Sequence, residues 1–264
     1  DFIRGFVREG SGMVLDDGKE YLVEARLRAM ARREGLASPD LLLQRLKHHA
    51  HGPLRDRFVQ EVLIGETRFF RDVHPFEALQ DVILPELVES ARDRRRLYVW
   101  CAASASGQEP YSVAMLLSEF PELTAWDTRI VATDLSDLML ERTRAGVYSQ
   151  TEIERGLSEA RRAEWFREGP EGRWTAREPL RRWIRTERNN LVSSWAHLPI
   201  MDLILIRNVL IYFDEQTKRD IIRRAHAHLR EGGYLMLGTS ESLPPEQREF
   251  EQVRVGRTIC YRRV

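Results

Sequence analysis

The chain has 264 residues, 42% of them hydrophobic, which is enough to bury one large core or two smaller ones. Its 41 basic and 41 acidic residues give a formal net charge of zero, which argues against a protein built to bind nucleic acid in bulk. No apolar run approaches the roughly 20 residues of a membrane span and no signal peptide is visible, so we expect a cytoplasmic protein that inserts no segment into a membrane.

Residues 1–75 are predicted to form an all-helical N-terminal domain. Apolar residues recur there at helical spacing in two stripes: Val23, Leu27 and Met30, then Leu41, Leu42 and Leu46. The segment 38–40, Ser-Pro-Asp, has the composition of a helix start. Residues 76–96 indicate one more helix, which ends in the charged run 92–96. We interpret this helix as a linker into a second domain.

From residue 97 onward, predicted strands and helices alternate, which is typical of a doubly wound parallel α/β sheet. In chain order we expect strand 97–102, helix 109–120, strand 129–134, helix 136–145, a strand from Asp202, helix 214–229, a turn at Gly232 and Gly233, and strands 234–237 and 258–262. The alternation stops between residues 148 and 202, and we interpret residues 148–188 as an inserted β-subdomain. Cys101 and Cys260 lie in apolar runs and are expected to be buried, reduced thiols.

The most informative stretch is the apolar run 202–213, which a polar pair, Arg207 and Asn208, interrupts. An apolar run of this kind suits a parallel strand that is buried on both faces. Since ligands of open α/β sheets bind beyond the carboxyl ends of the strands, Arg207, Asn208 and Tyr212 are expected at the mouth of a pocket. The alternative is a buried strand whose polar residues merely cap it.

Two further segments follow predicted strands and suit a bound nucleoside. The loop 102–110 has small residues around Gly107, which would let a ligand approach the backbone and the N-terminus of the next helix, although packing alone also explains such a loop. It has neither a G-x-G-x-x-G pattern nor a Walker lysine, so a pyrophosphate clamp is poorly supported. Asp134 ends the next strand, where an acidic side chain accepts hydrogen bonds from ribose hydroxyls. Alternatively, Asp134 or Ser136 caps the helix that follows.

A third segment, 64–72, lies upstream of the sheet and places Phe69 and Phe70 among polar neighbours. On its own it suits the start of an amphipathic helix, with Thr67 as the cap. This segment becomes informative only in combination with the other segments.

Together these segments resemble the CheR family of chemotaxis receptor methyltransferases, which move a methyl group from S-adenosyl-L-methionine to receptor glutamates. The matching blocks are residues 65–71, 100–112, 133–134, 190–191 and 207–213. They span nearly the whole chain, the helical N-terminal domain included. The resemblance implies a Rossmann-like class I methyltransferase domain at 97–264, with S-adenosyl-L-methionine as cofactor and S-adenosyl-L-homocysteine as product.

The resemblance also implies which residues bind the cofactor. They are Thr67, Arg71, Ala102, Glu109, Asp134, Asn190, Leu191, Arg207 and Asn208. Glu109 is expected near the methionine end, Asp134 at the ribose, and Asn190 with Leu191 at the adenine. Two departures from the family pattern matter. Gly65 replaces the usual asparagine and loses a side-chain contact, and Gln108 replaces a glutamate, which leaves the negative charge to Glu109.

Arg71 and Tyr212 are the residues that the resemblance implies in catalysis, with Thr67 reaching over the cofactor beside Arg71 and Asn208 bordering the methyl-transfer site. A glutamate acceptor is already ionised at neutral pH and needs no general base. The protein must align the carboxylate, methyl group and sulfur and exclude water. No metal is expected, and we interpret the histidines at 48–51 as a solvated helix end.

Substrate docking is expected on the basic face of one N-terminal helix. The arginines of this face are Arg26, Arg28, Arg32 and Arg33. The resemblance implies that they meet the acidic cytoplasmic helical hairpin of a methyl-accepting chemoreceptor. The alternative is a solvated charged face, partly balanced by Glu20, Glu24 and Glu34.

The inserted subdomain has a compact turn after Trp165, where Pro170 restricts the backbone. Little chain remains there to build a peptide-binding edge, so we expect a monomeric enzyme that does not depend on a C-terminal receptor pentapeptide. Two rival functions stay open. One is a methyltransferase of the same fold with another acceptor, although segment 207–213 lacks the Asp/Asn-Pro-Pro-Tyr of base-methylating enzymes. The other is a cofactor-binding regulatory protein without turnover.

Overall fold

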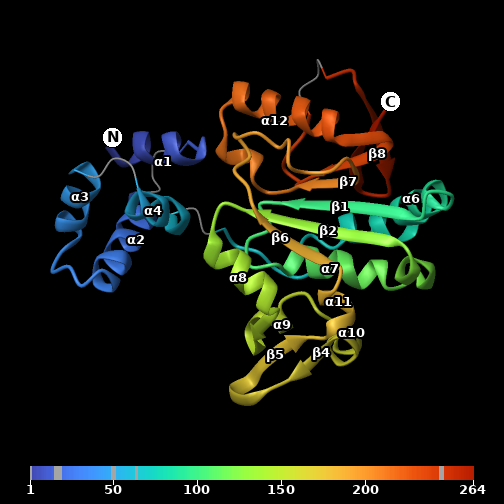
Figure 1. The fold of residues 1–264 in the computed structure, drawn as a ribbon, viewed down its shortest axis with the longest axis horizontal. Coiled ribbons are helices and arrows are strands. Elements are labelled where there is room, and N and C mark those ends of the chain that lie inside the picture. Colours follow the sequence, from blue (N-terminus) through green and yellow to red (C-terminus); the bar gives the residue numbers. More distant parts are fainter. Residues whose placement is uncertain (1, 15–19, 49–51, 63–64, 244–246) are drawn as a thin grey trace.

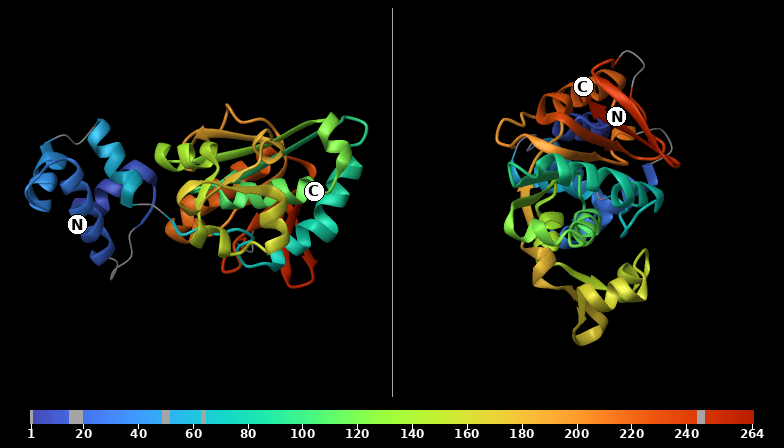
Figure 2. Two further views of the ribbon diagram at one scale, coloured as in Figure 1. Left: turned by 90° about the horizontal axis from the view of Figure 1, so that it is seen from below. Right: turned by 90° about the vertical axis from the view of Figure 1, so that its right-hand side faces the viewer.

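The computed structural model describes residues 2–14, 20–48, 52–62, 65–243 and 247–264. A helical N-terminal unit lies beside an α/β unit, from which a small lobe projects (Figure 1). Figure 2 shows the same division from two other directions. Within the described residues, no helix combines the length and the apolar character that crossing a membrane requires.

The N-terminal unit consists of α1 (Phe2–Ser11), α2 (Glu20–Arg33), α3 (Pro39–His48) and α4 (Pro53–Val62). Its core contains both predicted stripes: Leu27, Met30, Leu42 and Leu46 are buried there, with Val23 partly buried. Leu41 is the exception, because its side chain is 42% exposed. The helical unit also ends earlier than residue 75, since residues 65–73 form turns and irregular structure.

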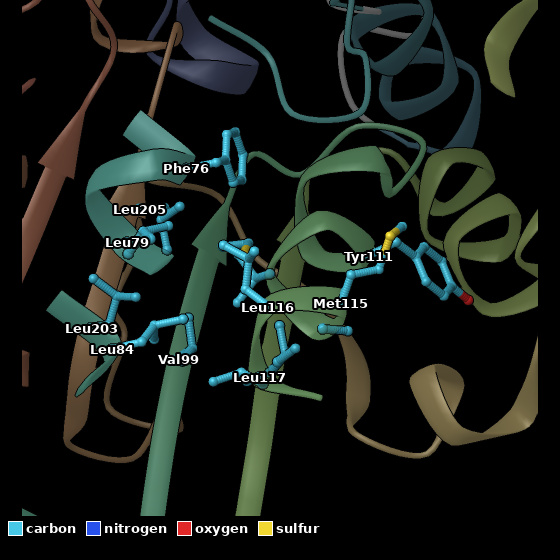
Figure 3. Packing of buried hydrophobic residues seen from close by; sticks show 14 of the residues in the cluster. Phe76, Leu79, Leu84, Val99, Tyr111, Met115, Leu116, Leu117, Leu203 and Leu205 are labelled. Carbon is cyan, nitrogen blue, oxygen red and sulfur yellow. The ribbon is translucent and has the colours of Figure 1, made fainter. Parts of the chain in front are cut away.

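The helix expected as a linker is instead part of the α/β unit. It runs through α5 (His74–Ala78), a π-helical turn (Leu79–Ile83) and α6 (Leu84–Ala91). Its apolar face, with Phe76, Leu79 and Leu84, packs against Val99 and Leu203 of the sheet (Figure 3). A helix that buries a full apolar face in this way belongs to the core that it covers.

The large sheet has seven strands in the order β6-β2-β1-β7-β8-β10-β9. Their bounds are β1 (Arg96–Ala102), β2 (Asp127–Asp134), β6 (Ile184–Arg188), β7 (Met201–Ile206), β8 (Leu229–Leu237), β9 (Phe250–Val255) and β10 (Thr258–Arg263). The pairs from β6 to β8 are parallel, while β10 pairs antiparallel with both β8 and β9. The sheet is therefore doubly wound with an antiparallel edge.

Helices cover both faces of this sheet (Figure 1). The remaining helical segments of the α/β unit are α7 (Gln108–Leu117), a 3₁₀ turn (Pro121–Ala125), α8 (Asp137–Ala145), a 3₁₀ turn (Leu210–Tyr212) and α12 (Glu215–His228). Strand β1 divides its side chains between two cores: Val99 and Cys101 face the core under α7, whereas Trp100 faces the core under α12. This alternation is what a central strand with two buried faces requires.

The C-terminal strands differ from the expectation. Strand β8 begins at Leu229 and runs through Gly232 and Gly233, where a turn was predicted, and β9 was not predicted at all. The pairing of β7 with β8 shifts register near Met201, and a Cβ at Gly233 would lie 2.9 Å from the carbonyl oxygen of Asp202. Gly233 thus allows a close approach and Gly232 a positive φ within an irregular strand, and this pair of glycines resembles a turn in sequence.

The inserted lobe holds a three-stranded antiparallel sheet in the order β3-β5-β4. Its elements are β3 (Val147–Ser149), α9 (Gln150–Glu154), α10 (Glu159–Trp165), β4 (Phe166–Glu168), a 3₁₀ turn (Pro170–Gly172), β5 (Arg173–Ala176) and α11 (Glu178–Arg181). The lobe ends before residue 188, because β6 pairs in parallel with β2 in the large sheet. The predicted β content of the insertion therefore divides between two sheets.

Candidate active site

A pocket lies beyond the carboxyl ends of β1, β2 and β7. The residues that line it are Ser11, Met13, Gly65, Glu66, Thr67, Arg68, Arg71, Ala103, Ser104, Ala105, Glu109, Asp134, Leu135, Asn189, Asn190, Leu191, Arg207, Asn208, Val209, Tyr212 and Phe213. The chain crosses from one side of β1 to the other between β6 and β7, so the pocket lies where the strand order reverses. Open α/β sheets bind their ligands at this position.

The pocket brings together every predicted cofactor-binding or catalytic residue except Ala102. Ala102 is the last residue of β1 and its side chain is 1% exposed, packed in the core under α12. The next residues, Ala103, Ser104 and Ala105, line the pocket instead. The side chain of Ala102 therefore points into the core, and a contact between Ala102 and the cofactor stays a prediction.

Arg207, which lines the pocket, bridges two acidic side chains. Its Nη1 donates to Glu109 at 2.9 Å, and its Nη2 donates to Asp72 at 3.0 Å and to the carbonyl oxygen of Arg71 at 3.0 Å. The Arg207 side chain is only 1% exposed. Burial raises the pKa of Glu109, and the neighbouring Arg207 opposes that effect. The network therefore fixes the strand end, the loop before α5 and the first turn of α7 to one another.

Asp134 organises the loop between β1 and α7. Its Oδ2 accepts from the backbone N–H of Ala105 at 2.8 Å, and its Oδ1 accepts from that of Ser136 at 2.9 Å. Ser136, rather than Asp134, occupies the position that caps α8. Each carboxylate oxygen keeps a second lone pair, so Asp134 can still accept hydrogen bonds from a ligand. Burial raises the pKa of Asp134.

The N-terminal unit supplies one wall of the pocket through Ser11 and Met13, which sequence reasoning missed. Asn190 donates from Nδ2 to the carbonyl oxygen of Gly10 at 3.1 Å, and the backbone N–H of Val14 donates to the carbonyl oxygen of Tyr212 at 2.7 Å. Helix α1 contains no sequence motif that would predict this contact. The side chain of Asn190 thus tethers α1 across the pocket.

The inserted lobe holds the loop 65–73 over the pocket. Phe69 packs edge-on against Tyr148 and Phe166, with ring centroids 5.0 and 5.5 Å apart. Arg155 forms an ion pair with Glu66. Gly156 has a positive φ, and a Cβ there would lie 2.0 Å from the carbonyl oxygen of Phe69. The lobe therefore positions the segment that carries Thr67 and Arg71.

Buried polar atoms in the pocket indicate a polar ligand. Ser104 Oγ, Asn189 Nδ2 and Arg207 Nε are buried without a hydrogen-bond partner among the described residues, and all three residues line the pocket. Such atoms normally have a partner, so a bound ligand is the natural source of one. The described residues contain no group of three His, Cys, Asp or Glu side chains placed to hold a metal ion, and His49 and His51 lie outside those residues.

Comparisons with known proteins show the family of this chain. Residues 65–259 match the S-adenosylmethionine-binding domain of CheR methyltransferases, and residues 1–63 match their all-alpha domain. The chain belongs to the CheR methyltransferase family. It is 38% identical to a chemotaxis protein methyltransferase of Pseudomonas putida, over 98% of this chain and 95% of that protein. A relative from Pseudomonas aeruginosa is 39% identical over 99% and 96% of the two chains, and one from Vibrio parahaemolyticus 39% identical over 99% and 95%.

Membership of the CheR family confirms the expected fold, a doubly wound α/β unit preceded by a helical unit, and the expected cofactor, S-adenosyl-L-methionine. The family match assigns residues 65–96 to the cofactor-binding domain, in agreement with the packing of α5 and α6. The pocket fits this cofactor, since it offers carboxylates for a cationic, hydroxyl-bearing ligand and apolar side chains such as Leu191 and Phe213 for an adenine ring. The contacts of single residues with the cofactor stay predictions.

We expect cofactor affinity to fall as the pH is lowered from neutrality. Burial raises the pKa of Asp134 and of Glu109, so each carboxyl of the empty protein takes up a proton at a higher pH than usual. A ligand that donates hydrogen bonds to the ionised form lowers that pKa, and binding below the raised pKa must then release a proton. Calorimetry of S-adenosyl-L-homocysteine binding in buffers of different ionisation heat measures this release. Equal proton release by Asp134→Asn and wild type would contradict a part played by Asp134.

Proposed function

We propose that this chain transfers a methyl group from S-adenosyl-L-methionine to glutamate side chains in the cytoplasmic helical hairpin of a chemoreceptor. The observation that carries the proposal is the convergence of Arg71, Asp134, Asn208 and Tyr212, from three separate segments, on one pocket. Relatives named chemotaxis protein methyltransferase align with nearly the whole chain, which favours a chemoreceptor as substrate. The protein would act as a monomer, without nucleic acid and without a membrane-inserted segment.

The main requirement that this reaction places on the protein is to align the acceptor carboxylate with the methyl group and the sulfur of the cofactor. The cofactor supplies an activated methyl group on a positively charged sulfur. One oxygen of the ionised glutamate forms the new bond to the methyl carbon, the carbon–sulfur bond breaks, and its electron pair stays on sulfur. Asp134 would hold the ribose, while Tyr212 and Arg71 would place the acceptor carboxylate in line and limit access of water. No proton needs to be removed, so no general base is required.

Docking of the receptor would use the basic residues of α2. Arg28, Arg32 and Arg33 are exposed and Arg26 is half-buried. Arg28 forms an ion pair with Glu24 at 2.5 Å, and Arg33 pairs with Glu61. An acidic receptor helix would replace the Arg28–Glu24 pair with its own carboxylates at little cost, because both side chains are 60% exposed and exposed pairs contribute little to stability.

The double variant Arg28→Glu/Arg32→Glu is expected to raise KM for receptor and leave the affinity for S-adenosyl-L-homocysteine unchanged. Wild-type activity should fall with added salt, because exposed charges are screened over ~10 Å at 0.1 M. A matched control is the double variant Arg92→Glu/Arg129→Glu. These two arginines are exposed and lie near the amino ends of the strands, at the opposite end of the sheet from the pocket. Equal receptor kinetics in both double variants would favour the solvated-face alternative for α2.

Binding of a C-terminal receptor pentapeptide is not expected. The link between β4 and β5 is the single 3₁₀ turn Pro170–Gly172, preceded by Gly169, so the lobe has no extended loop beside its edge strand. Titration of the protein with the pentapeptide, followed by amide NMR, measures this directly. Micromolar binding that shifts the signals of residues 165–188 would contradict the prediction.

The function itself is tested with radiolabelled S-adenosyl-L-methionine and membranes enriched in receptor from the source organism. We expect label on the receptor that mild base releases as methanol, since glutamyl methyl esters are base-labile. Asp134→Ala serves as the binding-deficient control. Label on another acceptor would favour the rival methyltransferase, and cofactor binding without any transfer would favour the regulatory protein.

A further inference from the structure

Glu241 lies in the turn after β8, and its half-buried carboxylate accepts hydrogen bonds from backbone N–H groups on two segments. The donors, with their N···O distances, are Asn208 (2.7 Å), Gly238 (2.7 Å), Val209 (3.0 Å) and Ile211 (3.3 Å). Most of these donors belong to segment 207–212, which follows β7 and lines the pocket. Hydrogen bonds to an ionised acceptor are about twice as strong as neutral ones.

The segment that Glu241 binds has an unfavourable backbone conformation, which its hydrogen bonds help to stabilise. Asn208 has φ 57°, in the left-handed region that residues other than glycine rarely adopt. The backbone then enters the 3₁₀ turn Leu210–Tyr212, whose first N–H groups have no partner within the turn. Glu241 accepts from the N–H of Ile211 in this turn and from those of Asn208 and Val209 just before it, so it fixes the segment to the end of β8.

Gly238 allows the carboxylate to come this close. A Cβ on Gly238 would lie 2.5 Å from Oε2 of Glu241 and 2.8 Å from the backbone nitrogen of Asn208. Its φ is not positive, so an alanine would meet only this steric conflict. Gly238 and Glu241 thus act together to fix the backbone conformation of segment 207–212.

We propose that Glu241 is a positioning residue for methyl transfer, which holds Asn208 and Tyr212 in the orientation that the acceptor and the methyl group require. Glu241 is not one of the described residues that line the pocket, so it acts through the segment that it binds. The inference rests on the proposed function for its acceptor. The geometry of the segment can be measured without any acceptor.

Glu241→Gln tests the proposal with little change of shape. The glutamine amide replaces one acceptor oxygen by a donor group, which then faces N–H donors. We expect kcat to fall about 10- to 100-fold, because small displacements of reacting groups have effects of this size. The affinity for S-adenosyl-L-homocysteine should change by less than about threefold, since Asp134 and Asn190 are untouched. The matched control is Glu215→Gln, an exposed glutamate of α12 beside the same turn, which should keep wild-type kinetics.

A second variant and a second measurement keep the test independent of folding and of the acceptor. Gly238→Ala should reproduce the loss of kcat by displacing the carboxylate. Amide hydrogen exchange at Asn208, Val209 and Ile211 should be faster in Glu241→Gln than in wild type, while exchange along β7 stays the same. Unchanged kcat or unchanged exchange at these amides would overturn the proposal, as would a loss of kcat matched by an equal loss of S-adenosyl-L-homocysteine affinity. If the wild type methylates no receptor, the proposed function fails, and the exchange measurement still decides the role of Glu241.

Discussion

Arg207→Met is expected to lower the free energy of unfolding by about 3–5 kcal/mol, since it leaves the largely buried carboxylate of Glu109 without the guanidinium that pairs with it. Arg207 is 1% exposed and pairs with Glu109, which is 13% exposed, and with Asp72, which is 21% exposed. Burial already raises the pKa of Glu109. Without the guanidinium, that pKa should rise further and the carboxyl should take up a proton nearer to neutral pH. Urea unfolding at neutral pH, followed by tryptophan fluorescence, measures the change.

A compensated ion pair provides the control for this prediction. Asp202 is 2% exposed and pairs with Arg94 at 2.6 Å and with Arg230 at 3.1 Å. Arg94→Met leaves Arg230 in place, so it should cost much less than Arg207→Met. Adding Glu109→Gln to Arg207→Met should restore part of the stability, because the unpaired charge is then removed. Unfolding of Arg207→Met at the wild-type urea midpoint would contradict the role of the network.

The sequence predicts the pocket well because parallel strands bring their carboxyl ends to one edge of the sheet. Asp134 ends β2, and Arg207 follows β7 directly. Each could be placed at that edge from its position behind an apolar run, and a strand that is buried on both faces leaves little choice of register. The resemblance then added Thr67 and Asn190, which no strand pattern would have placed there.

What the sequence leaves open concerns partners that are distant along the chain. Asp72 and Glu241 contact Arg207 and Asn208 from separate loops, and neither belongs to a periodic pattern. The contact between Asn190 and the carbonyl oxygen of Gly10 in helix α1 likewise joins residues that are distant along the chain. The apolar stripe of the helix 74–91 predicts that one face is buried but does not say which surface buries it. Amphipathicity fixes a face, and only the tertiary structure fixes its partner.

Asp134→Ala is expected to weaken binding of S-adenosyl-L-homocysteine by roughly 10- to 150-fold, which corresponds to about 1.5–3 kcal/mol for a hydrogen bond to a charged group. The ribose contact accounts for the direct part of the loss. An indirect part comes from the loop between β1 and α7, since Asp134 also accepts from the backbone N–H groups of Ala105 and Ser136. Isothermal titration calorimetry measures the affinity, and thermal unfolding of the unliganded variant checks its fold.

Two further variants separate these contributions. Asp134→Asn keeps one acceptor oxygen and the volume of the side chain, so its affinity should lie between that of wild type and that of Asp134→Ala. Asp137→Ala removes a nearby aspartate whose side chain is 57% exposed and lies outside the pocket lining, and it should bind like wild type. Wild-type affinity in Asp134→Ala would exclude Asp134 as the ribose ligand. A loss shared equally by Asp134→Ala and Asp137→Ala would point to a general loss of negative charge near the pocket rather than to a ribose contact of Asp134.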